Sequence, residues 1–490
     1  WVLDVPVRMQ PDTPLRTDWA IGWARDSSEA VARVRAFYAR PDYEPVRASA
    51  HAEWNALRSR LTVETPDPAL NQMANGWLLH QVLASRVRGR TGLYQPGGAF
   101  GFRDQLQDML ALLPFDPARV RAHLLYCAAR QFEDGDAMHW WHDPFLGVRT
   151  NIRDDVLFLP YVTARYVRWT EDMGVLGERI PYLKNVEIEP GKEDRFCEMQ
   201  PGEESGTLHD HCMRAFRRAA QTGEHGLALM GGGDWNDGMN RVGAEGRGES
   251  VWLTEFLIAC ATEYARIAPD ESDAAWLSSL ADRLMAAVEA HGWDGGWYLR
   301  AYADDGSPLG SALSPACQID AISQAWAVLA GLDEERCAQA MDAAWQRLAD
   351  ERTGIIRLLA PPFPPNGMDP GYIRGYPEGV RENGAQYTHA ACWVALALIQ
   401  MGDAARAHRA ISMLLPPNHA NSPEAAARYR VEPYVVAADV YDGVYAGRGG
   451  WTWYTGSAAW LYTCILARLG FERRGGRVRP CARLGDWPEA

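Results

Sequence analysis

The stretch 386-QYTHAACWVALALIQMG-402 shows the pattern that decides the fold. Its apolar side chains recur at intervals of three and four residues, which places them on one face of an α-helix. Gly402 follows the last periodic residue, where helices commonly end. Similar patterns recur along the chain, at residues 28–40, 66–86, 117–131, 152–170, 205–222, 253–267, 273–290, 318–329, 334–349 and 456–469. The sequence therefore predicts a mainly α protein.

The segments between these helices are long and rich in Gly, Pro and Trp. Helical bundles connect their helices by short turns, whereas long loops fit a ring of helical hairpins, here with roughly a dozen helices. Residues that bind ligands then belong on loops at one end of the ring. We assign residues 63–469 to this helical body.

Both ends of the chain differ from the helical body. Residues 1–26 alternate like the tail of a β region, and residues 27–62 are predicted as linker helices. Residues 470–490 begin with a predicted β-hairpin that turns on Gly475 and Gly476, as at the start of a β domain. Because the chain opens on Trp1 without a signal pattern, we expect it to be a piece of a longer polypeptide.

Composition excludes several classes of function. A net charge of −14 argues against nucleic-acid and anionic-membrane partners, which require basic surfaces. No apolar run is long enough to span a membrane. Nine scattered Cys residues without a CxxC pair predict reduced, mostly buried thiols and a cytoplasmic location. Twenty Trp and nineteen Tyr exceed what a core needs, and sugar-binding clefts use such rings.

The candidate for catalysis is the loop 231-GGGDWNDGMN-240. It holds two carboxylates, Asp234 and Asp237, with Trp235 and Asn236 between them. A carboxyl group that protonates a leaving oxygen needs a raised pKa, which a neighbouring indole and a second carboxylate could provide. The alternative is an Asx-turn or a Ca²⁺ loop, although EF-hand spacing is absent. The residues alone leave both interpretations open.

Three further motifs combine cations, hydroxyls and helix starts. Arg103 and Asp104 lie at the start of a predicted helix. Either they bind an anion or sugar hydroxyls, or Asp104 caps the helix and Arg103 lies on the surface. Arg381 and His389 precede another helix, where His389 holds phosphate or is a satisfied core residue. The run 449-GGWTWYTGS-457 ends in a hydroxyl and free backbone N–H groups, or is an aromatic core strip with an N-cap.

A fifth cluster, 139-HWWHD-143, spaces His139 and His142 like a metal pair. The sequence offers no third ligand, so we interpret the cluster as an aromatic wall of the cleft and predict no metal site.

Taken together and in this order, the motifs resemble the cellobiose/chitobiose phosphorylases, glycoside hydrolase family 94. The runs at 100–108, 233–240, 381–389 and 451–456 carry the resemblance. The fuller strings at 95–108, 131–142, 243–252 and 431–441 look most like the 1,2-β-oligoglucan phosphorylases and the C-terminal region of cyclic β-1,2-glucan synthases. The resemblance implies an (α/α)6 barrel with remnants of flanking β domains.

The resemblance also implies the roles of the site residues. Asp237 matches the general acid. The residues that match phosphate ligands are Arg103, His389, Thr455 and Gly456. The residues that match sugar-binding positions are Asp104, Asp108, Trp235, Arg381 and Glu382, with either Arg90 or Arg86 as a further arginine.

The implied reaction is the inverting phosphorolysis of β-1,2-linked gluco-oligosaccharides by a hexosyltransferase, which gives α-glucose 1-phosphate and a shortened glucan. Its co-substrate is inorganic phosphate, and it requires no cofactor. Phosphate arrives as an anion, so it replaces the water and the base of an inverting hydrolase. Ala438 stands where cellobiose phosphorylases have Gln, which favours a linkage other than that of cellobiose.

Three alternatives remain at this point. The chain resembles the chain-length-controlling domain of a cyclic β-1,2-glucan synthase as well as a free-standing phosphorylase. An inverting β-glucan hydrolase would need a second carboxylate across the cleft from Asp237. A non-catalytic glucan-binding module would need neither the acid nor the phosphate ligands. The sequence leaves the assembly open between a homodimer and part of a larger polypeptide.

Overall fold

The computed structural model describes residues 24–40, 42–89, 99–474 and 477–480, together with a few positions before residue 24. The chain divides into two compact units, Trp1–Ser59 and Arg60–Ala490. In the first unit, α1 (Ser27–Tyr38) and α2 (Glu44–Arg58) lie in the range predicted for linker helices. The carboxylate of Asp26 accepts a hydrogen bond from the Glu29 backbone N–H, an N-cap that explains where α1 begins.

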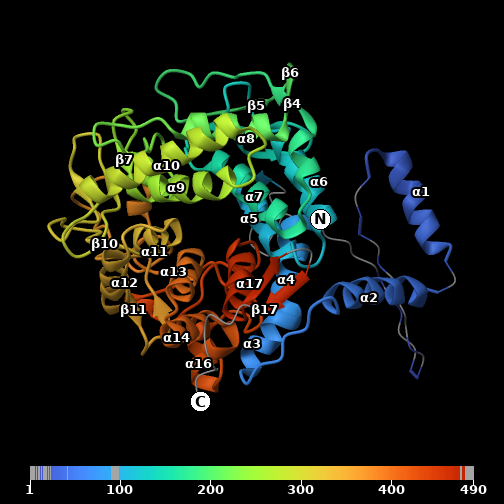
Figure 1. Cartoon of the computed structure of the whole chain (residues 1–490). Helices are drawn as coiled ribbons and strands as arrows, with labels where there is room; N and C mark the ends of the chain where they lie inside the picture. The colour runs from blue at the N-terminus through green and yellow to red at the C-terminus, as the bar shows by residue number, and fades with distance from the viewer. Residues whose placement is uncertain are drawn as a thin grey trace. The chain divides into compact units, whose positions relative to one another are not determined.

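The described part of the second unit is built around a closed ring of six helices (Figure 1). Each helix contacts the next, and the last contacts the first. The inner helices are α5 (Phe102–Leu112), α7 (Phe158–Thr170), α9 (Val251–Ala265), α11 (Ala321–Ala330), α13 (Thr388–Met401) and α17 (Ser457–Arg468).

An outer layer of helices packs against this ring. Its first member runs through four consecutive segments, α3 (Pro68–Gln72), η1 (Met73–Trp77), α4 (Leu78–Gln81) and η2 (Val82–Arg88). The others are α6 (Pro117–Ala128), α8 (Leu208–Ala219), α10 (Glu271–His291), α12 (Glu334–Leu348) and α14 (Ala404–Leu414). The chain is mainly α and forms an (α/α)6 barrel, which confirms the predicted fold class.

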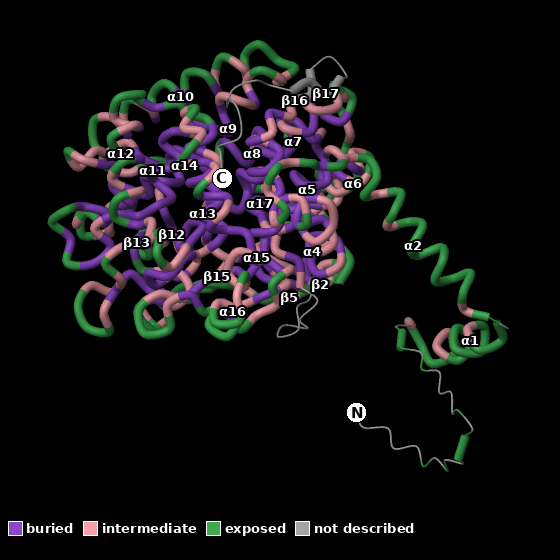
Figure 2. Tube along the Cα trace, turned by 90° about the horizontal axis from the view of Figure 1, so that it is seen from below, coloured by how far each residue is buried: buried purple, intermediate pink, exposed green. Residues whose placement is uncertain are grey.

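The inner helices are largely buried (purple in Figure 2), and their aromatic side chains pack together in the middle of the barrel. Trp252, Trp326, Trp393 and Trp460 are at most 2% exposed. The Trp393 ring centroid lies 5.3 Å from that of Trp326 and 5.7 Å from that of Trp460. Part of the tryptophan surplus expected to line a sugar cleft is therefore core, because large rings supply the apolar area that a wide ring of helices must bury.

The six inner helices run in the same direction. Their carboxyl-terminal halves line one cavity of about 820 Å³, which contains none of the predicted site residues. Their amino-terminal ends therefore gather at the opposite end of the barrel. Every motif named in the sequence analysis lies at the start of an inner helix or in the loop that leads to one. The candidate site is therefore formed at the amino-terminal ends of the inner helices.

Short antiparallel strands connect the helices at the site end. One sheet joins β1 (Phe100–Gly101), β2 (Met138–His142), β3 (Leu146–Thr150) and β5 (Asp194–Glu198), and another joins β7 (Glu249–Ser250), β8 (Ala301–Tyr302) and β9 (Pro308–Leu309). The remaining pairs are β4 (Arg179–Leu183) with β6 (Pro201–Thr207), β10 (Ile319–Asp320) with β13 (Leu359–Ala360), β11 (Ala349–Asp350) with β12 (Ile355–Ile356), and β14 (Gln386–Tyr387) with β15 (Asp439–Val440).

The predicted C-terminal hairpin is present, as β16 (Phe471–Arg474) pairs with β17 (Arg477–Pro480). Most of the residues expected to form a β region at 1–26, and residues 481–490, lie outside the described residues, so the predicted domain boundaries there stay predictions. Eight cysteines in the described ranges form no disulfide, and seven of them are buried. No helix among the described residues has the length and apolar character to cross a membrane.

We expect Trp326→Ala to lower the free energy of unfolding by about 3–5 kcal/mol, because it opens a cavity in the aromatic centre of the barrel. The midpoint of urea unfolding, followed by fluorescence and circular dichroism, measures the change. Leu313→Ala is the control, since Leu313 is 93% exposed and truncating it removes little packing. Equal midpoints for the two variants would contradict this account of the core.

Candidate active site

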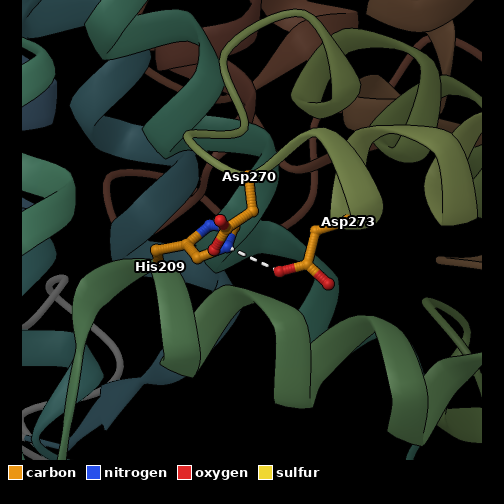
Figure 3. A group of neighbouring side chains, drawn as sticks. All are labelled: His209, Asp270 and Asp273. Atoms are coloured by element: carbon orange, nitrogen blue, oxygen red, sulfur yellow. Dashed lines mark hydrogen bonds and ion pairs between the residues drawn. The ribbon is translucent and has the colours of Figure 1, made fainter.

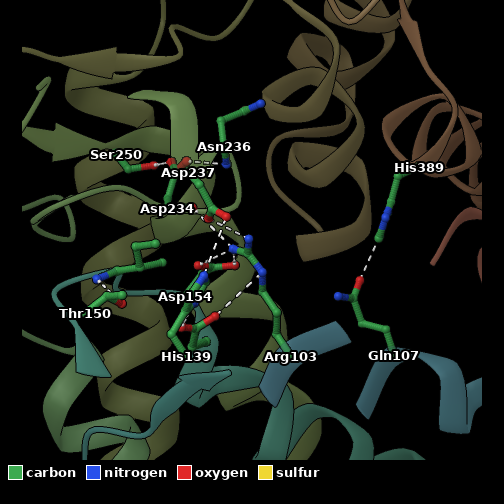
Figure 4. A network of polar contacts seen from close by, with 12 residues as sticks. Arg103, Gln107, His139, Thr150, Asp154, Asp234, Asn236, Asp237, Ser250 and His389 are labelled. Atoms are coloured by element: carbon green, nitrogen blue, oxygen red, sulfur yellow. Dashed lines mark hydrogen bonds and ion pairs between the residues drawn. The ribbon is translucent and has the colours of Figure 1, made fainter. Parts of the chain in front are cut away.

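The loop 231–240 is held by a buried ion pair. Arg300 donates two hydrogen bonds of 2.6 Å to the two carboxylate oxygens of Asp234, and both side chains are fully buried. The hydroxyl of Ser250, the N-cap of α9, donates to the same carboxylate at 2.7 Å. Figure 4 shows Asp234 and Ser250 side by side. Asp234 therefore braces the loop and is not free for proton transfer.

Sequence analysis missed Arg300. It stands inside the apolar run 297-WYLRA-301, and a charged residue in such a run is usually buried with a partner. That signal could have identified Arg300, but not its partner, which lies 66 residues away in the chain.

Asp237 begins the short 3₁₀ helix η5 (Asp237–Met239), and its side chain is 31% exposed. The Arg103 guanidinium donates a hydrogen bond of 2.6 Å to it. The same guanidinium donates two bonds of 2.9 Å to Asp154 and lies 3.6 Å from Asp155. Arg103, predicted as a phosphate ligand, thus orients the predicted acid and is shared among three carboxylates.

His139 is a site residue that sequence analysis did not find. Its Nδ1 lies 2.7 Å from Asp155 and its Nε2 lies 3.6 Å from Asp237. Burial would lower the pKa of His139, but Asp155 and Asp237 raise it well above its usual value. In the same motif Trp141 is fully buried, so the predicted aromatic wall of the cleft is wrong for Trp141. His139 stands at an irregularity of β2, where the register with β3 shifts between Met138 and Trp140.

The pKa of Asp237 corrects the sequence prediction of a raised value. Burial acts to raise it, but the charges of Arg103 and His139 outweigh burial and lower the pKa to about 2. The prediction invoked Asp234 as a neighbouring negative charge, and that charge is compensated by Arg300. In the ligand-free protein Asp237 is therefore a carboxylate.

A second group of residues surrounds the start of α17. Arg86 forms an ion pair of 2.9 Å with Asp108, and both side chains are buried. A Cβ added at Gly456 would lie 3.4 Å from His389 Nδ1 and 3.8 Å from an Arg86 nitrogen. The structure thus brings Arg86 together with Asp108, His389 and Gly456. Arg90, the other candidate arginine, lies outside the described residues.

Trp235 connects the two groups. Its side chain is 7% exposed, and its ring centroid lies 5.1 Å from that of His389. Thr455 stands beside them with its hydroxyl 2.8 Å from that of Ser457, and it accepts a hydrogen bond from the Ser457 backbone N–H. The predicted acid loop and the predicted phosphate ligands therefore meet at one end of the barrel, with Trp235 between them.

Arg381 and Glu382 form a third group. Arg381 has a φ of 50°, a left-handed conformation that is uncommon for a residue with a side chain. Its guanidinium lies 3.5 Å from Glu382 and 5.7 Å from the centre of the Trp451 ring. Burial raises the pKa of Glu382, and the charge of Asp237 adds to the effect. Asp104 lies in the first turn of α5, next to Arg103.

Cations and the starts of the inner helices gather at this end. Although the chain carries a net charge of −14, this end holds Arg86, Arg103, His139 and Arg381, each beside one or more carboxylates. The positive ends of the helix dipoles of the inner ring point to the same place. This arrangement can hold an oxyanion next to a carboxylate that exchanges a proton.

Elsewhere in the described ranges, one cluster has atoms placed to hold a metal ion, namely His209, Asp270 and Asp273 (Figure 3). Both ring nitrogens of His209 already have partners, since Nε2 lies 2.9 Å from Asp273 and Nδ1 lies 3.2 Å from the Tyr264 hydroxyl. These contacts connect α8 with α9 and α10.

Comparisons with known proteins agree with this geometry. The pattern of the "Glycosyl hydrolase 94 superfamily, catalytic domain" matches residues 53–469. Cyclic beta-(1,2)-glucan synthase NdvB of Rhizobium meliloti (strain 1021) is 48% identical over 450 residues, which cover 90% of this chain and 16% of that protein. Solabiose phosphorylase of Paenibacillus borealis is 34% identical over 453 residues, which cover 89% of this chain and 54% of that protein. The chain thus spans only part of these relatives.

Among solved structures, a bacterial glucoamylase complexed with acarbose superposes with a TM-score of 0.57 and 12% identity. The superposition covers 90% of this chain and 61% of the glucoamylase. At this identity the likeness concerns the fold alone.

We expect Asp234→Asn to destabilise the protein by about 3–5 kcal/mol, because it leaves the buried Arg300 charge without its main partner. Urea unfolding measures the loss. Asp282→Asn, at an exposed position of α10, is the matched control and should change stability little. A stable Asp234→Asn variant would show that the ion pair does not support the loop.

The low pKa of Asp237 predicts a pH-dependent contribution to stability. A carboxyl group whose pKa falls from about 3.9 in the unfolded chain to about 2 in the folded one stabilises the fold at neutral pH. That contribution is lost as the pH falls from roughly 5 toward 2. Wild type should therefore unfold at higher urea than Asp237→Asn at pH 7, and the difference should shrink toward pH 3. A difference that is constant or grows on acidification would show that the pKa is not lowered.

Proposed function

Because this chain belongs to the glycosyl hydrolase 94 superfamily through its catalytic domain, we propose that it is an inverting phosphorylase of β-1,2-linked gluco-oligosaccharides. Its products are α-glucose 1-phosphate and a shortened glucan. The linkage comes from the name of one relative, a cyclic beta-(1,2)-glucan synthase. The reaction type comes from the name of another, a phosphorylase. The free cysteines agree with a cytoplasmic location.

One observation supports the phosphorylase more than any other. Asp237 lies in the same loop as Trp235, whose ring packs 5.1 Å from that of His389, and His389 lies beside Arg86 and the start of α17. An acid next to an anion site is what phosphorolysis requires, because the nucleophile is itself an anion. The leaving oxygen takes a proton from Asp237 while a phosphate oxygen attacks the anomeric carbon from the opposite face, which inverts the configuration.

The lowered pKa of Asp237 fits this proposal when the ligands are considered. Phosphate brings negative charge close to Arg103 and His139, and the saccharide displaces water. Both changes disfavour the carboxylate form of Asp237. The acid then becomes protonated only in the complex, when both substrates are present.

The hydrolase alternative has less support. An inverting hydrolase needs a carboxylate that is free to activate water. Five other carboxylates of this end, Asp108, Asp154, Asp155, Asp234 and Glu382, each lie within 3.6 Å of an arginine nitrogen. Burial raises the pKa of Asp108, Asp154 and Glu382, but a carboxylate held by a guanidinium is not free to position a water molecule for attack.

A second candidate function rests on the 48% identity to a cyclic beta-(1,2)-glucan synthase. In this second candidate function, the chain is part of a larger synthase, and the same phosphorolytic site shortens the glucan chains that the synthase makes. The two candidates differ in the length of the final product. A length-controlling site should stop at a narrow range of longer glucans, whereas a free-standing phosphorylase should continue to short oligosaccharides.

The linkage preference rests on Ala438. Its backbone carbonyl accepts a hydrogen bond of 2.8 Å from Thr388 at the start of α13, and its backbone N–H donates to Trp451. The methyl group therefore stands beside the site end, where cellobiose phosphorylases carry the longer, polar Gln.

We expect α-glucose 1-phosphate to appear when the protein is incubated with β-1,2-gluco-oligosaccharides and inorganic phosphate, and a chelator to have no effect. Cellobiose should react far more slowly. Asp237→Asn should lower the rate by about 10²–10⁴-fold in both directions, because the same carboxyl group is the acid of phosphorolysis and the base of synthesis. Asp282→Asn is again the control and should keep the wild-type rate.

Three outcomes would contradict the proposal. Glucan breakdown at full rate without phosphate would favour the hydrolase. Equal rates on cellobiose would contradict the linkage. An active Asp237→Asn variant together with an inactive but folded Asp234→Asn variant would mean that the acid is Asp234.

A further inference from the structure

Gln107 joins His389 to Trp460 through a single oxygen atom. Gln107 Oε1 lies 2.7 Å from His389 Nε2 and 2.7 Å from Trp460 Nε1. All three side chains are buried, with exposures of 0%, 5% and 2%. Figure 4 shows Gln107 and His389 facing each other across this contact.

Chemistry fixes where the protons of this group lie. An indole N–H can only donate, so the Gln107 atom that meets Trp460 must be the carbonyl oxygen. That oxygen has no hydrogen to give, so His389 Nε2 must carry a hydrogen and donate it. In a neutral imidazole the other nitrogen, Nδ1, then holds a lone pair. Trp460 thus determines the tautomer of His389 through Gln107.

The surroundings keep His389 neutral. Burial lowers its pKa well below the usual value, and the charges of Arg86 and Arg103 lower it further. Each of these effects opposes a second proton on the ring. Nδ1 is therefore a hydrogen-bond acceptor next to the Arg86 guanidinium, which offers donors.

Nδ1 lies beside the start of α17. A Cβ placed on Gly456 would lie 3.1 Å from His389 Cε1 and 3.4 Å from Nδ1, so a side chain at this position would crowd the ring. The Arg86 guanidinium borders the same space. The amide nitrogen of Gln107 is buried and has no hydrogen-bond partner among the described residues. The Arg86 guanidinium and the lone pair of Nδ1 thus lie together at the start of α17, as an anion that carries a proton would require.

We propose that His389 Nδ1 accepts a hydrogen bond from the protonated oxygen of phosphate, so that the site selects oxyanions that carry a proton. Gln107 and Trp460 are the positioning residues that set this preference. The inference rests on the proposed function, in which His389 binds phosphate. It adds that phosphate and arsenate are accepted, whereas sulfate is rejected.

The selectivity follows from the protons of the anions. At neutral pH, phosphate and arsenate keep at least one O–H group, whereas sulfate is fully deprotonated. A sulfate oxygen would meet the lone pair of Nδ1 with no hydrogen between them. A buried polar group left unpaired in this way weakens binding, here by on the order of 100-fold for sulfate relative to phosphate.

The test compares the binding of phosphate, arsenate and sulfate by calorimetry at constant ionic strength. In parallel, ¹⁵N NMR of labelled histidines reports which ring nitrogen of His389 is protonated, with His389→Asn to assign the signal. Wild type should bind both protonated anions far more tightly than sulfate, and Nδ1 should be unprotonated.

Trp460→Phe removes the donor that orients Gln107, so the amide can turn over and the tautomer of His389 is no longer set. The preference for phosphate over sulfate should fall about tenfold or more, because one hydrogen bond that holds the Gln107 amide in place is lost. Trp393→Phe is the matched control, because Trp393 packs 5.0 Å from the His389 ring and its indole N–H has no hydrogen-bond partner among the described residues. It should keep the wild-type ratio.

Gln107→Glu provides a second variant if Trp460→Phe does not fold. A carboxylate at this position would accept from Trp460 and attract a second proton to His389, which turns Nδ1 into a donor. Sulfate should then bind better than in wild type, relative to phosphate.

The outcomes separate this inference from the proposed function. If wild type binds sulfate as tightly as phosphate, or if Nδ1 carries the hydrogen in the NMR spectrum, the inference is overturned even when the protein is a phosphorylase. If no β-glucan is phosphorolysed but the selectivity and its loss in Trp460→Phe are observed, the inference stands and the proposed reaction fails.

Discussion

The pair between Arg300 and Asp234 is the interaction on which the rest of the site depends. Both side chains are fully buried, so neither charge could be tolerated without the other. Through Ser250 the pair connects to the start of α9, and through an ion pair of 3.4 Å with Asp320 it connects to the start of α11. The acid loop is therefore attached to two inner helices, and the position of Asp237 follows from that attachment.

The same pair decides the chemistry of Asp237. Because Arg300 compensates the charge of Asp234, the remaining close partners of Asp237 are the cations Arg103 and His139. A carboxyl group in this environment stays ionised until an anion arrives. In the proposed reaction, protonation of Asp237 is thereby linked to the binding of phosphate.

The barrel explains why these groups meet at one end. Six parallel inner helices bring their positive amino-terminal ends together, and the connecting loops supply the side chains. The packed tryptophans in the middle separate this end from the cavity at the carboxyl-terminal ends. His389 and Trp460 belong to both regions, since their rings pack in the core while their polar atoms meet at Gln107. Core packing therefore sets the orientation of a predicted ligand-binding residue.

Local patterns in the sequence were sufficient to predict the helices, the fold class and most of the motif residues. Helical periodicity repeats every few residues, and motifs such as 231–240 are contiguous, so both can be recognised without the fold. Partners could not be predicted in this way. Arg103 meets Asp237 across 134 residues, and His389 meets Gln107 across 282. The roles of His139 and Arg300 and the contacts of Arg86 could not be read from the sequence, because a pKa or a tautomer depends on which charges the tertiary structure brings together.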